Sequence, residues 1–291
     1  MCGSLVTCTL ATCHSLLPMP ELPEVETTVR ALRPFITNQI FTEIRNYWPR
    51  HIAIPSVTEL QARLHGQVVE SVGRRGKYLL FNLDSGDVLI IHLKMSGHLA
   101  IVPQETPPDK YAHTIFGFAN GQEMRFRDTR KFGRVYLVAD AEEIVGKLGP
   151  EPLSDAYTAA VMKERINGRW RAIKPLLLDQ HFVAGIGNIY ADESLFYAGI
   201  HPTRPCNTLG DEEIGRLYTA VRKVLQEGID REGATIGTYR KPNGQRGDMQ
   251  NALAVFRRTG ESCYDCGTTI ERIVLGGRST HFCPACQPAR R

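Results

Sequence analysis

The spacing of hydrophobic residues changes partway along the chain. From Val68 to Val138, short apolar runs such as YLLFNL, VLIIHL and HTIFGF are separated by turn sequences such as DSGD, KMSG and ANGQ. Short strands separated by turn residues at close intervals are typical of an antiparallel sandwich or barrel. We therefore predict an antiparallel β-sandwich domain over residues 20–149.

A helix is predicted in front of these strands. In LPEVETTVRALRPF, Pro23 suits a first helical turn, and Glu24 and Glu26 lie near the positive end of the helix dipole. Apolar residues follow at helical spacing. Pro34 should end this helix because proline disrupts a helix interior.

Helical patterns dominate after residues 150–154, a predicted linker that contains Pro150 and Pro152. Four segments have helical spacing: DAYTAAVMKERI, IKPLLLDQ, IYADESLFYAG and DEEIGRLYTAVRKVLQEGI. They predict a helical domain over residues 155–250, in which residues 237–250 form a polar loop. With residues 251–291 as a further small unit, the expected fold class is α+β.

Composition narrows the functional classes only slightly. The chain has 291 residues, 42% of them hydrophobic, a formal net charge of +4 and a pI near 8.6. A mildly basic protein of this kind can bind a polyanion, although many such proteins do not. Since no apolar run approaches the roughly 20 residues of a membrane helix, no membrane association is expected. Residues 1–19 lack the basic start of a secretory signal and are treated as a leader.

Cysteine spacing gives the strongest chemical signal. Two C-x-x-C pairs near the C-terminus are separated by sixteen residues, and four thiolates so arranged can close a tetrahedral zinc site with no open position. Incidental pairs or disulfides are the alternative. We expect one structural zinc per chain, and the alternation on both sides of Gly276-Gly277 indicates a β-hairpin finger. The predicted ligands are Cys263, Cys266, Cys283 and Cys286.

Three further segments could bind nucleic acid, but each has a simpler explanation. GIGNIYADE places Asn188 before a helix, where backbone amides can hold a phosphate, although most such glycine segments are only turns. RFRDTRKFGR could present Arg130 and Phe132 from a turn as a wedge, with Met95 of KMSG as a second wedge, or form a solvated strand face. GRRGKYLL, which contains Lys77, is by itself best explained as solvated charge.

Taken in order, these segments resemble the formamidopyrimidine-DNA glycosylase family of bacterial base-excision enzymes. The similarity runs from Pro20 to about Gln287 and includes PELPEVET, GRRGKYLL, HLKMSGHL, DTRKFGR, LGPEPLSD, GIGNIYADESLF, AGIHP and the cysteine hairpin. It implies a helix-two-turn-helix in the helical domain, zinc, and damaged double-stranded DNA as partner. A monomer in the bacterial cytoplasm, associated with the nucleoid, is expected.

The resemblance also implies removal of oxidised purines (8-oxoguanine and formamidopyrimidines) and cleavage of the resulting abasic site. Endonuclease VIII enzymes, which prefer oxidised pyrimidines, typically begin PEGPE, so Leu22 favours the purine-directed branch. An endonuclease VIII-like activity remains an alternative.

Site residues follow from the same resemblance. Pro20 corresponds to the nucleophile, Glu21 to the carboxylate that handles protons at the sugar, and Lys77 to a lysine at the lesion's phosphates. Glu24 and Glu193 correspond to further catalytic acids. The residues implied in DNA binding are Met95, His113, Arg130, Phe132, Asn188, Tyr239 and Arg278.

Two turns and the leader depart from the family pattern. Lys94 stands where glycine is frequent and Thr129 where proline is frequent, and neither changes a proposed role. The leader has a larger consequence, because the nitrogen of an internal Pro20 is an amide without a free lone pair. Either Met19 is the true start or the leader is removed, or the chain is a lesion-binding protein without catalysis.

Overall fold

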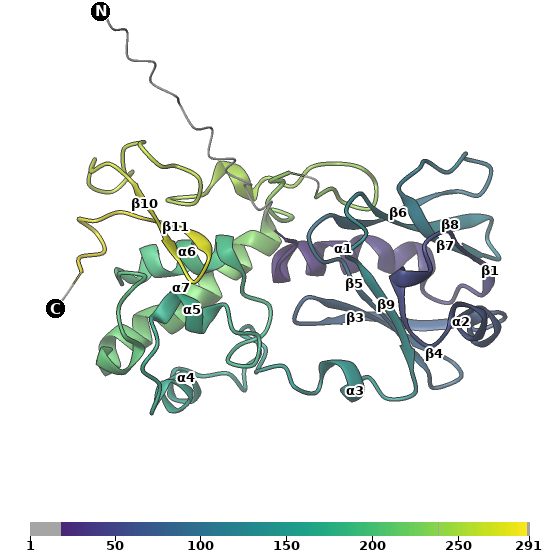
Figure 1. Cartoon of the computed structure of the whole chain (residues 1–291), viewed down its shortest axis with the longest axis horizontal. Coiled ribbons are helices and arrows are strands. Elements are labelled where there is room, and N and C mark those ends of the chain that lie inside the picture. The colour runs from purple at the N-terminus through teal and green to yellow at the C-terminus, as the bar shows by residue number, and fades with distance from the viewer. Residues whose placement is uncertain (1–18, 238, 290–291) are drawn as a thin grey trace, which may run out of the picture.

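The computed structural model describes residues 19–237 and 239–289. Strands gather in one lobe, and most of the helices, together with a β-hairpin, form the other (Figure 1). Helix α1 (Leu22–Ile36) joins the two, because it contacts strand β3 in the first lobe and helix α7 in the second. Leu22 at its start belongs to the helical core, whereas Val25 and Val29 belong to the strand core.

The first lobe is a β-sandwich, as predicted. One sheet has the order β1-β7-β8-β6 and the other the order β2-β9-β5-β4-β3. Every pair is antiparallel except β2 with β9, which is parallel. Apolar side chains between the sheets, among them Phe81 and Phe126, form its core. The strands are β1 (Phe41–Asn46), β2 (Ile52–Ile54), β3 (Val69–Arg75), β4 (Tyr78–Leu83), β5 (Val88–His92), β6 (Gly97–Pro103), β7 (Ala112–Phe118), β8 (Gln122–Asp128) and β9 (Arg134–Val138).

Two details of this lobe differ from the sequence expectations. The prediction that Pro34 ends the first helix is wrong, because α1 continues to Ile36. Proline is tolerated there because it lies in the last turn, and the Thr37 amide still donates to the Arg33 carbonyl at 3.2 Å. Strands β1 and β2 lie before the region in which strands were predicted. A register shift between Phe41 and Ile44 disturbs the apolar alternation in β1, and β2 has only three residues, so neither strand has a clear sequence pattern.

The second lobe contains the four predicted helices around one apolar core. Helix α6 is buried along nearly its whole length, and α7 packs on it. Its helices are α4 (Ala159–Ile166), α5 (Ile173–Leu177), α6 (Asn188–Ala198) and α7 (Asp211–Asp230). Two short helices, α2 (Val57–Leu64) and α3 (Glu142–Val145), lie outside this lobe. None of the helices in the described residues has the length and apolar sequence needed to cross a membrane.

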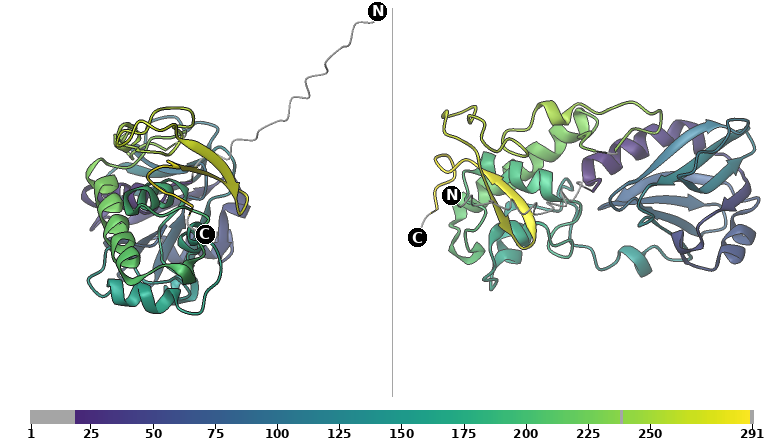
Figure 2. Two further views of the ribbon diagram at one scale, coloured as in Figure 1. Left: turned by 90° about the vertical axis from the view of Figure 1, so that its left-hand side faces the viewer. Right: turned by 45° about the horizontal axis from the view of Figure 1, so that its top comes forward.

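The predicted hairpin is formed by strands β10 (Glu271–Leu275) and β11 (Arg278–Phe282). Gly276 and Gly277 adopt φ values of 57° and 73°, the left-handed region that a two-residue hairpin turn requires. Arg278 therefore stands at the tip, paired with Leu275. Figure 2 shows the hairpin lying over the helical lobe.

The segment predicted as a linker makes close contacts with the sandwich. The Glu151 carboxylate accepts hydrogen bonds from the Arg74 guanidinium at 2.6 Å and the Arg75 guanidinium at 3.0 Å. It also accepts one from the Gly76 amide at 2.5 Å. Arg74 and Arg75 are therefore neither solvated charges nor free phosphate ligands: they hold the start of the helical lobe against the turn that precedes Lys77.

Candidate active site

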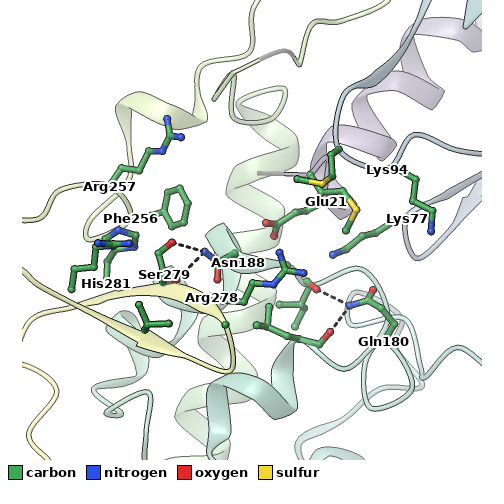
Figure 3. A pocket seen from close by; sticks show the side chains of 18 of the residues that line it. Glu21, Lys77, Lys94, Gln180, Asn188, Phe256, Arg257, Arg278, Ser279 and His281 are labelled. Carbon is green, nitrogen blue, oxygen red and sulfur yellow. Dashed lines mark hydrogen bonds between the residues drawn. The ribbon is translucent and has the colours of Figure 1, made fainter. Parts of the chain in front are cut away.

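A cavity of about 970 Å³ is lined by both lobes and the hairpin (Figure 3). Its ionisable lining residues are Glu21, Lys77, Lys94, Arg134, Arg257, Arg272, Arg278 and His281. Glu21 is the one acid among the described residues that line it. A concave surface with this excess of cations suits a polyanion.

Half of the predicted catalytic and DNA-binding residues meet in this cavity. Those that line it are Glu21, Lys77, Met95, Phe132, Asn188 and Arg278. The other predicted site residues are not among the described residues that line it: Pro20, Glu24, Glu193, His113, Arg130 and Tyr239. Met19 and Glu21, the residues on both sides of Pro20, do line the cavity.

Glu21 is the residue that caps α1 and is buried at the junction of the lobes. Its carboxylate accepts hydrogen bonds from the amides of Ile189 at 3.0 Å and Tyr190 at 3.4 Å, in the first turn of α6. Burial raises its pKa to about 7, with the Glu24 charge acting in the same direction and the Lys77 charge against it. A carboxyl group with such a pKa can donate or accept a proton near neutral pH.

Glycine at the end of the preceding loop makes this contact possible. A Cβ atom on Gly187 would lie 2.2 Å from the Glu21 carboxyl carbon. One on Gly185, which has a φ of 87°, would lie 2.6 Å from a Leu22 methyl carbon. The glycines of GIGN therefore allow Glu21 to approach the start of α6. There the Glu21 carboxylate accepts hydrogen bonds from backbone amides that the sequence pattern suggested as phosphate ligands.

Glu24 lies behind Glu21, one helical turn further along α1. It accepts hydrogen bonds from the Tyr190 hydroxyl at 2.8 Å, the Ala234 amide at 2.7 Å and the Glu21 amide at 2.9 Å. Burial raises its pKa despite these bonds. Glu24 thus fixes the backbone at Glu21 and ties α1 to the segment that follows α7.

Lys77 is buried in the turn between β3 and β4, and its amine points into the cavity toward Glu21 (Figure 3). Burial lowers its pKa, the charges of Glu21 and Glu24 oppose that shift, and the Arg278 charge adds to it. Lys77 and Glu21 therefore form a coupled pair, in which protonation of either depends on the other.

Asn188 and Arg278 lie on the same side of the cavity, because the hairpin packs against the start of α6. The Asn188 amide nitrogen donates to the Ser279 carbonyl at 3.0 Å, while its side-chain oxygen is buried without a hydrogen-bond partner among the described residues. Arg278, at the hairpin tip, projects into the cavity (Figure 3). Both residues line the cavity.

A buried ion pair that the sequence analysis missed fixes the hairpin to α6. The Lys174 amine lies 2.7 Å from an Asp192 oxygen and donates to the Ser279 carbonyl and the Thr280 hydroxyl, each at 2.8 Å. The other Asp192 oxygen accepts from the His281 amide at 3.0 Å. Adjacent acids, Asp192 and Glu193, in a helix whose other side chains are mostly apolar were the sequence signal that could have revealed this pair.

Glu193, next along α6, supports the chain that leads into the finger. Its carboxylate accepts hydrogen bonds from the amides of Ala254, Val255 and Phe256 at 2.7, 3.0 and 2.8 Å. Burial raises its pKa to about 7. Its contacts are those of an anchor for residues 254–256, and a direct catalytic role stays a prediction.

The other residues predicted to contact DNA are described by their contacts within the protein. The Arg130 guanidinium lies 5.0 Å above the ring of Phe132, which is 46% exposed. His113 is buried, with its ring 5.8 Å from that of His51. The Tyr239 hydroxyl donates to the Glu24 carbonyl at 3.3 Å. The DNA-binding roles of these residues stay predictions.

The four cysteines of the finger converge as a zinc site requires. Their sulfur atoms all lie within 4.8 Å of one another, and measured pairs are 3.5 Å (Cys266 to Cys283 and to Cys286) and 3.9 Å (Cys263 to Cys286). Tetrahedral zinc with Zn–S bonds of about 2.3 Å places its sulfurs about 3.8 Å apart. The site therefore fits structural zinc with all four positions filled by protein.

Comparison with known proteins places these features in one family. The family description "Formamidopyrimidine-DNA glycosylase N-terminal domain" matches residues 19–135, and "Formamidopyrimidine-DNA glycosylase H2TH domain" matches residues 148–240. "Zinc finger found in FPG and IleRS" matches residues 260–289.

Named relatives agree over nearly the whole chain. A formamidopyrimidine-DNA glycosylase of Geobacillus kaustophilus is 46% identical over 274 residues, covering 92% of this chain and 100% of that protein. One of Bacillus subtilis is 43% identical, covering 92% and 99%.

Solved structures give the same result. A Lactococcus lactis Fpg complex with DNA containing Fapy-dG has a TM-score of 0.87 at 37% identity and covers 92% of this chain and 100% of its own. MutM (Fpg) of Thermus thermophilus has a TM-score of 0.84 at 40% identity and covers 94% and 100%. The sandwich, the helical lobe around α6 and the four-cysteine hairpin are thus shared with these enzymes, and the chain belongs to the formamidopyrimidine-DNA glycosylase family.

Proposed function

We propose that this protein removes oxidised purines from duplex DNA and then cleaves the abasic site, with Pro20 as nucleophile. The observation that carries this proposal is the pairing of buried Glu21 with Lys77 in a basic cavity that is also lined by Met19, so that the residues on both sides of Pro20 line it. The relatives' names and the Lactococcus lactis complexes with Fapy-dG and abasic DNA support the same substrates. DNA as substrate places the enzyme in the bacterial cytoplasm, at the nucleoid.

The reaction requires a free amine at Pro20. That nitrogen attacks C1′ of the sugar as the glycosidic bond breaks, and the departing base takes a proton from Glu21. The Glu21 carboxylate then takes the proton that the attacking amine loses and gives it to O4′ as the C1′–O4′ bond breaks, which opens the sugar ring and leaves an iminium between C1′ and Pro20. Because the amine of proline is secondary, the resulting iminium cannot lose a nitrogen-bound proton and stays a strong electron sink. It therefore promotes loss of a proton from C2′ and departure of the 3′ phosphate, and then of the 5′ phosphate, before water releases the sugar fragment.

The lesion must leave the stack before this chemistry can occur, at a cost of order a few kcal/mol. Phe132 and Met95 line the cavity, and Arg130 lies against Phe132. These three side chains are the proposed wedge that fills the gap in the duplex. Asn188 and Arg278 are the proposed phosphate ligands on the opposite wall.

A substrate panel tests the proposed activity. Protein beginning at Pro20 should excise 8-oxoguanine and formamidopyrimidines from duplex oligonucleotides much faster than oxidised pyrimidines, with strand cleavage at the same sites. Faster release of oxidised pyrimidines would instead support the endonuclease VIII-like alternative. Binding of all lesions without excision would support a lesion-binding protein.

Loss of a proposed phosphate ligand should weaken all DNA binding alike. Asn188→Ala or Arg278→Ala should reduce affinity for damaged and undamaged duplex by a similar factor. Arg278→Ala should also reduce the slope of log affinity against log salt concentration by about one. Affinity is measured by titration at several salt concentrations. Lys163→Ala is the control, because this exposed lysine pairs with Asp211 and does not line the cavity. A loss confined to one lesion would contradict phosphate binding.

Removal of zinc should disable the finger. Cys266→Ser should reduce metal content from about one zinc per chain to none and abolish duplex binding, because the finger has few apolar contacts of its own and depends on the metal to fold. Metal analysis and DNA titration measure both effects. Cys206→Ser is the matched control, since Cys206 is buried in the helical lobe. Normal DNA binding by zinc-free protein would refute this prediction.

A further inference from the structure

The proposed wedge residues come from two turns at the same end of the sandwich. Met95 lies in the turn between β5 and β6, and Arg130 and Phe132 lie in the turn between β8 and β9. Strands β6 and β8 are neighbours, and Gly97 at the start of β6 pairs with Asp128 at the end of β8. The two turns therefore lie side by side at the same end of this strand pair.

One buried carboxylate contacts both turns. One oxygen of Asp128 accepts hydrogen bonds from the Ser96 hydroxyl and from the Arg130 amide, the latter at 3.1 Å. The other oxygen accepts from the Gly133 amide at 2.7 Å. Asp128 thus fixes both ends of the turn that carries Phe132 and, through Ser96, the residue next to Met95.

Ser96 completes this connection. Its hydroxyl oxygen accepts a hydrogen bond from the Arg130 amide at 3.1 Å while donating to Asp128. Both side chains are almost fully buried. Burial by itself would raise the pKa of Asp128, but the hydrogen bonds that it accepts outweigh burial and lower the pKa to about 2. The carboxylate therefore remains charged, and its hydrogen bonds strong, at any pH at which the enzyme works.

The Phe126 ring packs closely against the backbone of both turns. A Cβ atom on Gly97 would lie 2.7 Å from a ring carbon of Phe126, and one on Gly133 would lie 2.3 Å from another. The His51 ring stacks on Phe126, with ring centres 4.2 Å apart, and its Nε2 lies 3.7 Å from Asp128. Neither turn can move toward the core without disturbing this ring.

We infer that Asp128 and Ser96 are positioning residues that hold the two wedge turns together as one preformed unit for base extrusion. This inference rests on the proposed function of Met95, Arg130 and Phe132 as the wedge. Neither Asp128 nor Ser96 lines the cavity. They act on the lesion only through the turns, by keeping the wedge side chains in place before DNA arrives, so that little ordering remains to be done on binding.

The test compares excision of 8-oxoguanine paired with cytosine against excision of the same lesion in an unpaired bulge. Ser96→Ala removes the shared hydroxyl, and Ser96→Thr restores a hydroxyl at that position. Ser96→Ala should slow excision about tenfold on the paired lesion, as expected for loss of a hydrogen bond to a charged group. Its effect on the unpaired lesion should be small, and Ser96→Thr should recover the rate on the paired lesion.

A further variant separates the possible failures. Phe132→Ala should show the same preference for the unpaired lesion, and if it does not, the wedge itself is wrong. If Phe132→Ala shows the preference and Ser96→Ala does not, the wedge stands and the present inference is overturned. Equal slowing of both substrates by Ser96→Ala would also overturn it.

Asp128→Asn provides a second route to the same result. Asparagine keeps one acceptor oxygen but cannot accept from Ser96, Arg130 and Gly133 together, so the paired lesion should again be slowed more than the unpaired one. Fluorescence of 2-aminopurine placed opposite a stable abasic analogue reports wedge insertion directly. Ser96→Ala and Asp128→Asn should both reduce the increase in fluorescence on binding. An unchanged increase in both variants would contradict the positioning role.

Discussion

Protein whose chain begins at Pro20 is expected to form a covalent adduct with 8-oxoguanine duplex DNA in the presence of borohydride, and protein that retains Met1 to Pro18 is not. In the longer chain the Pro20 nitrogen is an amide, and no side-chain movement restores its lone pair. As a terminal amine it titrates near pH 8, so a useful fraction is unprotonated near neutrality. The adduct is measured as a shift on a denaturing gel.

Two controls make this comparison specific. Both proteins should bind an abasic-site analogue, which shows that the leader removes chemistry and not folding. The N-terminus of each protein must be sequenced, because removal of the leader during expression would make the two preparations identical. A comparable adduct from intact long protein would refute Pro20 as nucleophile.

Glu21→Gln is expected to slow base excision by roughly 10² to 10⁴. Glutamine can still accept the hydrogen bond from the Ile189 amide, which is 3.0 Å from Glu21, so the junction with α6 should persist. It has no proton to give to the departing base. Cleavage of a preformed abasic site should be less affected, because no base remains to be protonated. Equal loss on both substrates would contradict the assigned role.

The pH profile tests the same assignment. The pKa of Glu21 is raised to about 7 by burial, so its protonated form is lost as pH rises through that value. The unprotonated, nucleophilic form of the terminal amine increases as pH rises toward about 8. Excision should therefore peak between these values, and Glu21→Gln should lack the alkaline decline. Glu26→Gln, on the same helix, should keep the full profile, because Glu26 pairs with Arg30 and Arg74 and does not line the cavity.

Local sequence patterns predicted the helices, strands and hairpin of this fold better than the contacts between segments that are distant in the sequence. The cysteine spacing and Gly276-Gly277 predicted the zinc hairpin because ligand and turn chemistry act over a few residues. Contacts between distant residues left no such pattern. Arg74 and Arg75 were best explained as solvated charge, yet Glu151 binds both.

The candidate site shows the same division. Resemblance predicted Glu21 and Lys77, and both line the cavity. It did not reveal Asp128, Lys174 or Asp192, because their importance comes from burial against segments far away in the sequence. Arg125, taken as part of a solvated or DNA-binding face, is instead buried beside Glu123 at 2.8 Å. Only the folded chain distinguishes such internal ion pairs from surface charge.

Lys77 competes with Pro20 as the candidate nucleophile. Burial lowers its pKa, and its amine points into the same cavity as Glu21. An amine with a lowered pKa is a better nucleophile near neutral pH, so Lys77 could also form a Schiff base. Its iminium would differ from that of proline in being able to lose a proton from nitrogen.

The most direct test is to locate the sugar fragment in the borohydride-reduced adduct by digestion and mass spectrometry. The account predicts that the fragment is attached to the nitrogen of Pro20, in the N-terminal peptide of protein beginning at that residue. Attachment to the Lys77 peptide would contradict it.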